Sequence, residues 1–129
     1  METAAAIAAT LLGAIAVFQL ALAIGAPWGR AAWGGQHPCV LPGRFRAASA
    51  FVGIVVYPLF VVVVLVAAGV VERDGIWTPV EAVMWGLTAF FGLGAVANSV
   101  SRSRPERVWG PVSLAIAVCC GIVAAGMPG

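Results

Sequence analysis

The sequence contains few side chains that could do chemistry, and they are scattered among long apolar stretches. A catalytic site needs a nucleophile beside a base, paired carboxylates or a metal cluster, and no such set stands at helical spacing. The single histidine, His37, is two residues from Cys39, but two ligands do not make a metal site. The adjacent Cys119 and Cys120 fall inside an apolar stretch, which is typical of packing residues. We therefore expect no cofactor and no metal, and we do not expect an enzyme.

Two glutamates, Glu81 and Glu106, have the spacing of helix-capping residues. Glu81 follows Thr78 by three residues, and Glu106 follows Ser103 by three, with a proline in between in each case. This spacing predicts a capping box at the start of a helix. We expect both carboxylates to lie at membrane interfaces, which leaves no ionisable residue deep in a span of the kind that a proton- or cation-coupled pump ordinarily uses.

The amides within the apolar stretches offer a second type of site. Gln19 and Asn98 fall toward the same half of the membrane when the rise of about 1.5 Å per residue is counted along their helices. They either hydrogen-bond between helices, which we favour, or line a polar vestibule rimmed by arginines that suits a polar or anionic ligand. Tyr57-Pro58 predicts a kink near the middle of the second apolar stretch, because proline removes one helical hydrogen bond.

The segment 25–46 is too rich in Gly and Pro to span a membrane and too rich in aromatic residues for a solvated connector. It is expected to lie in the headgroup layer, either as an interfacial anchor or as a site for a phosphate or lipid headgroup. Any ligand is expected to contact side chains of this segment, polar side chains of the spans and arginines of the third connection. These residues are Gln19, Trp28, Arg30, Trp33, His37, Arg44, Arg46, Tyr57, Asn98, Arg102 and Arg104.

These residues must be positioned by four apolar stretches, about 4–26, 47–71, 79–100 and 104–127. Each has about 20 residues, enough to cross a hydrocarbon core of about 30 Å as a helix. The prediction is one all-α domain, 1–129, with four transmembrane helices in an antiparallel bundle of two hairpins. The valine run 61–64 is expected to be helical, because backbone groups cannot stay unpaired in lipid.

Composition and charge support a membrane location. The chain is 62% hydrophobic and 9% charged, with a net charge of +2, so it lacks the basic surface of a nucleic-acid binder. Six of the seven arginines fall in the first and third connections, which places those loops in the cytoplasm and both termini on the non-cytoplasmic side of the cell membrane. Glu2 before the first stretch and Arg30 after it favour a retained helix over a cleaved signal peptide.

Small residues recur at helical spacing on three of the stretches, as in 110, 113, 117, 121 and 124, and they predict close helix packing within the chain or with a partner. Three functions remain open. The chain is first expected to be an interaction or accessory subunit, self-associated or within a larger membrane complex. The alternatives are a small oligomeric transporter or channel for a polar or anionic ligand, and a lipid-headgroup-binding protein.

Overall fold

The computed structural model describes residues 1–72 and 79–127, and over these residues its regular structure is helical. Four continuous helical segments are long and apolar enough to span a membrane, which suggests a multi-pass membrane protein. The helices are α1 (Glu2–Ala23), α2 (Gly43–Phe51), η3 (Val52–Val56), α3 (Tyr57–Ala67), α4 (Val80–Ser99), α5 (Arg104–Arg107) and α6 (Trp109–Gly126), and the first connection carries the short 3-10 turns η1 (Gly29–Ala31) and η2 (Trp33–Gly35).

The first two spans end at glycines in the left-handed conformation. Gly25 has φ +105° and Gly69 has φ +78°. After each helix the backbone N–H groups reach back to helix carbonyls in a Schellman pattern, with Ala26 bonded to Ala21 and Val70 bonded to Leu65. These caps end α1 at Ala23 and α3 at Ala67, so the helices stop before the ends of the predicted ranges 4–26 and 47–71.

The predicted capping box at Ser103 is not formed. α5 begins after Ser103, but the Ser103 side chain makes no cap hydrogen bond and donates instead to the carbonyl of Arg30. The capping prediction for Glu106 is therefore wrong. At the third span the N-cap residue is Pro79, again with no side-chain cap hydrogen bond, and Thr78 lies outside the described residues.

A π-helical turn precedes Pro58 in the second span. The ring of a proline inside a helix clashes with the carbonyl four residues earlier, here that of Ile54. The wider turn of η3, Val52–Val56, stands directly before Tyr57-Pro58, and such turns are a known way to absorb a helix irregularity. The expected kink thus takes the form of a π-turn, and α2, η3 and α3 form one span, Gly43–Ala67.

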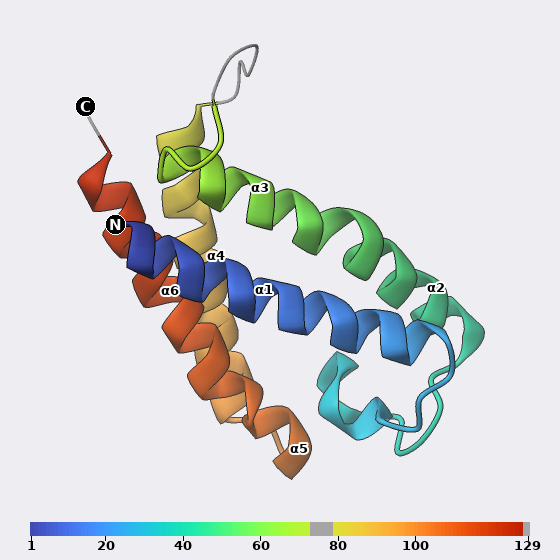
Figure 1. Cartoon of the computed structure of the whole chain (residues 1–129). Helices are drawn as coiled ribbons and strands as arrows, with labels where there is room; N and C mark the ends of the chain where they lie inside the picture. Colours follow the sequence, from blue (N-terminus) through green and yellow to red (C-terminus); the bar gives the residue numbers. More distant parts are fainter. Residues whose placement is uncertain (73–78, 128–129) are drawn as a thin grey trace.

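The spans form two pairs that diverge toward one end (Figure 1). α4 lies beside α6 and α1 lies beside α3, and the pairs meet near the end that holds both termini. At the opposite end the pairs separate, and the turns η1 and η2 lie between them. A large apolar core fills the end near the termini, and a small second core of Leu22, Ala32 and Leu41 lies beneath the first connection.

The α4–α6 contact uses the small residues of α6. Gly110 packs against Ser99 and Gly121 packs against Thr88, so the two helices run in opposite directions. A Cβ atom on Gly121 would lie 3.5 Å from Thr88 Cγ2, whereas one on Gly92 would meet no neighbouring atom within 4 Å. Within this chain, Gly121 marks a helix contact and Gly92 does not.

Candidate functional site

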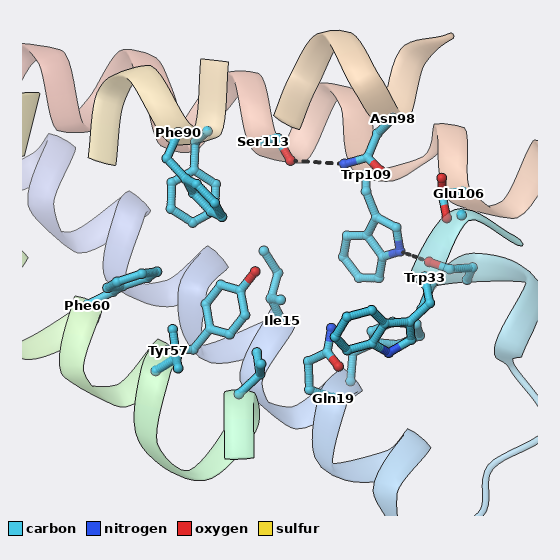
Figure 2. A pocket seen from close by; sticks show the side chains of 17 residues that line it. Ile15, Gln19, Trp33, Tyr57, Phe60, Phe90, Asn98, Glu106, Trp109 and Ser113 are labelled. Atoms are coloured by element: carbon cyan, nitrogen blue, oxygen red, sulfur yellow. Dashed lines mark hydrogen bonds between the residues drawn. The ribbon is translucent and has the colours of Figure 1, made fainter. Parts of the chain in front are cut away.

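A cavity of about 360 Å³ lies between the two helix pairs, next to the turns of the first connection (Figure 2). This volume is within the range of small-molecule sites, roughly 300–1,000 Å³. Every span contributes to its wall, and Phe90, which is more than half exposed, marks a side open to the surroundings. The lining residues are Ile15, Phe18, Gln19, Ala31, Ala32, Trp33, Gly34, Val52, Val56, Tyr57, Phe60, Phe90, Phe91, Asn98, Glu106, Trp109 and Ser113.

One side of the cavity carries hydrogen-bonding groups. The Asn98 amide lies 3.5 Å from Ser113 Oγ across α4 and α6, which is a weak hydrogen bond. Gln19, on α1, has a buried Oε1 atom without a hydrogen-bond partner among the described residues. The two amides therefore line one cavity, and they retain hydrogen-bonding capacity that a ligand could use.

Glu106 is the charged residue of this cavity. Only 8% of its surface is exposed, and its Oε2 atom is buried with no hydrogen-bond partner in the described part of the chain. A buried carboxylate without a partner is costly, so such groups usually pair with a positive charge. The expectation that Glu106 caps α5 fails, because its side chain lines the cavity and the Ser103 N–H donates to Ser101 Oγ instead.

A periodicity signal for Glu106 was present in the sequence. Counting back from the small-residue stripe of α6, Glu106 is four residues before Gly110 and seven before Ser113, both of which are buried. Residues at this spacing share one face of a helix. The stripe thus extends one turn further toward the N-terminus, and its first member is a carboxylate.

The other side of the cavity is aromatic. Phe60 lies edge-on to Phe91 with ring centroids 6.1 Å apart, and Tyr57 lies 5.7 Å from Phe60. Phe90 completes this group, and Figure 2 shows the Tyr57 hydroxyl directed into the space between the helix pairs. Rings in such tilted and edge arrangements form a rigid apolar wall. Sequence reasoning identified Tyr57 but missed the three phenylalanines, because Phe in a membrane span is ordinary.

The turns η1 and η2 close the cavity from the diverging end. Trp33 donates its indole N–H to Ser49 Oγ on α2 at 2.9 Å, and Trp109 donates to the carbonyl of Ala31 at 2.9 Å. Trp33 also has φ +52°, a left-handed conformation that costs a residue other than glycine about 1–3 kcal/mol and is often found at functional sites. The first connection is thus bonded to both helix pairs.

The arginines that we expected to rim a vestibule do not line this cavity. Arg30, Arg102 and Arg104 border a separate hollow of about 540 Å³, formed by the first connection and the start of α5. Arg46 donates to the carbonyl of Ala23 at 3.1 Å, which ties α2 to the end of α1. Arg44 lies over the ring of Phe45 at 5.0 Å.

The remaining predicted site residues belong to the first connection and pack against α1 and α2. Trp28 stacks on Phe18, with ring centroids 6.3 Å apart and planes at 3°. The His37 ring lies 5.0 Å from the ring of Phe45. Of the predicted ligand residues, the structure brings Gln19, Trp33, Tyr57 and Asn98 to the cavity, and it adds Glu106, Trp109 and Ser113.

In residues 1–72 and 79–127, no group of three or more His, Cys, Asp or Glu side chains could hold a metal ion. Comparison of the chain with family models, with curated proteins and with solved structures gives no match. The arrangement itself defines the class, a small helical bundle with a partly open cavity between its helix pairs that has one aromatic and one polar wall.

Proposed function

We propose that this protein is a membrane ligand-binding protein of the transporter type, which takes a small amphipathic molecule into the cavity between its helix pairs. The observation that carries the proposal is the coincidence of an aromatic wall with unpaired hydrogen-bonding groups in one cavity. Binding sites for small molecules have this composition, a mostly apolar lining with a few converging polar groups. One chain supplies every residue that lines this cavity, so ligand binding does not depend on an oligomer.

The same geometry supports an uncharged or positively charged ligand over an anionic one. The cavity wall includes Glu106, while Arg30, Arg102 and Arg104 border the separate hollow. An anion in the cavity would lie near a buried carboxylate and would be repelled by it in its charged form.

The structure offers less support for an interaction subunit than for a ligand-binding protein. It depended on small-residue stripes that could receive a partner helix. On α6 that stripe is occupied by α4, through the contacts of Gly110 and Gly121. Exposed apolar side chains such as Val17 and Leu93 are expected on any lipid-facing helix.

A matched pair of valines in η3 tests the proposal. Val56 lines the cavity, and its neighbour Val55 does not line it and is 45% exposed. In lipid nanodiscs, 4-fluorobenzyl alcohol should bind the wild-type chain and Val55→Trp, and it should not bind Val56→Trp, in which the new ring fills the cavity. The measurement is the ¹⁹F NMR signal, with protein-free nanodiscs as the partition control. No binding beyond that control, or full binding by Val56→Trp, would refute the proposal.

The basic hollow supports a second candidate function, binding of an anionic lipid headgroup. Arg30, Arg102 and Arg104 converge there from segments far apart in the sequence, and clustered arginines at a membrane surface attract acidic lipids. Co-purified lipids of the wild type should be enriched in acidic species by mass spectrometry, and Arg102→Gln with Arg104→Gln should remove that enrichment. An unchanged lipid profile would exclude this function.

For the orientation we propose cytoplasmic first and third connections and both termini on the non-cytoplasmic side of the cell membrane. The support is the distribution of arginines, six of which belong to the first and third connections, at the diverging end of the helix pairs.

A further inference from the structure

We infer that the ligand of the cavity is an organic cation, an amine or quaternary ammonium with an apolar or aromatic body, and that Glu106 binds its positive group. This inference rests on the proposed function and specifies its ligand. The proposed function concerns the size and hydrophobicity of the ligand, and the inference adds its charge.

The first step of the argument is the state of Glu106. Its side chain lines the cavity with 8% of its surface exposed, and its Oε2 atom has no partner among the described residues. A structural carboxylate in such a place is normally paired with a base. Here the nearby arginines turn elsewhere: Arg107 donates to the carbonyls of Ser101 and Arg102, and Arg30, Arg102 and Arg104 border the separate hollow.

The second step is the rest of the wall. Two indoles, Trp33 and Trp109, line the cavity together with the Tyr57 ring. The faces of such rings attract a cation that lies within about 6 Å of the ring centroid. Both indole N–H groups already donate, to Ser49 and to the Ala31 carbonyl, which fixes the orientation of the rings.

The third step is the division of the cavity. The carboxylate and the amides lie toward one side, and Phe60 and Phe90 lie toward the other, where Phe91 packs against both. A molecule with a compact positive head and an aromatic body satisfies both sides at once. A neutral aromatic molecule would fill the apolar side and leave Glu106 without a partner.

Two fluorinated probes test the inference in nanodiscs containing the full chain. (4-Fluorobenzyl)trimethylammonium should bind the wild type at least about tenfold more tightly than 4-fluorobenzyl alcohol, as expected for a charge-assisted contact. Glu106→Gln should lose this preference and still bind the alcohol. Glu106→Asp, which keeps the charge, should retain part of it, and Glu81→Gln, which alters an exposed glutamate outside the cavity, should behave as wild type.

The outcomes separate the two proposals. The cation inference is wrong, and the cavity proposal stands, if the alcohol binds and the cation binds no more tightly than the alcohol. The same conclusion follows if Glu106→Gln retains the preference for the cation. If neither probe binds the wild type above protein-free nanodiscs, the proposed function fails as well. If thermal unfolding shows that Glu106→Gln does not fold, Glu106→Asp becomes the deciding variant. Shortening the side chain should weaken the contact with the cation without removing it. The inference is therefore contradicted if the preference for the cation in Glu106→Asp equals that of the wild type, or if it is abolished.

Discussion

At the scale of single residues, Ser49 bonds the first connection to α2. Its side chain is fully buried and accepts the Trp33 indole N–H at 2.9 Å. Ser49→Ala leaves that donor without a partner, so we expect a loss of about 1–2 kcal/mol in the free energy of unfolding. Unfolding in mixed micelles measures it, with Thr10→Ala as the control, since the exposed Thr10 hydroxyl bonds only within its own helix. Equal stability of both variants would contradict this role for Ser49.

For Asn98 we expect a substitution to affect ligand binding more than stability. Its amide lies 3.5 Å from Ser113 Oγ, a contact too long to stabilise the bundle strongly, and it lines the cavity. Asn98→Leu should change stability by only about 0.6 kcal/mol and weaken 4-fluorobenzyl alcohol binding by about two- to tenfold. A large loss of stability with proportional loss of binding would show that the amide serves to join the helices. Gln19→Leu is the companion variant from the facing pair.

At the scale of elements, the contact between α4 and α6 depends on small side chains at one register. A Cβ atom on Gly121 would lie 3.5 Å from Thr88, so a longer side chain must push the helices apart. We expect Gly121→Leu to destabilise the bundle by about 1–3 kcal/mol. Gly92→Leu, on the same contact pair of helices but facing open space, should change stability by no more than about 0.5 kcal/mol. Unfolding of the two variants in matched micelles gives the comparison, and similar losses would show that both glycines meet neighbours.

At the scale of the whole molecule, the arginines of the first and third connections lie at the diverging end of the helix pairs, which predicts the orientation in the membrane. In a Cys39→Ser background, in which the two remaining cysteines are buried, Glu2→Cys should react with an impermeant maleimide added to intact cells. Gln36→Cys and Arg104→Cys should react only after permeabilisation. Labelling of residue 36 from outside would reverse the orientation, and labelling of both ends in intact cells would indicate dual topology.

The helical class and the number of candidate spans follow from the sequence alone. Lipid allows no unpaired backbone groups, so a chain with four apolar stretches of about 20 residues must form helices regardless of local propensity, even through the valine run 61–64. The ends of the helices were less certain from the sequence, because they depend on local bonds such as the Schellman caps at Gly25 and Gly69.

The composition of the cavity was decided by tertiary structure. Ser103 and Glu106 have the spacing of a capping box, yet the hydroxyl bonds to Arg30, 73 residues away, and the carboxylate turns into the cavity. The sequence suggested a common half for Gln19 and Asn98, because depth follows from helical rise. The sequence could not show that the arginines would lie outside the cavity and that Glu106 would line it, since this depends on how the two helix pairs diverge around the first connection.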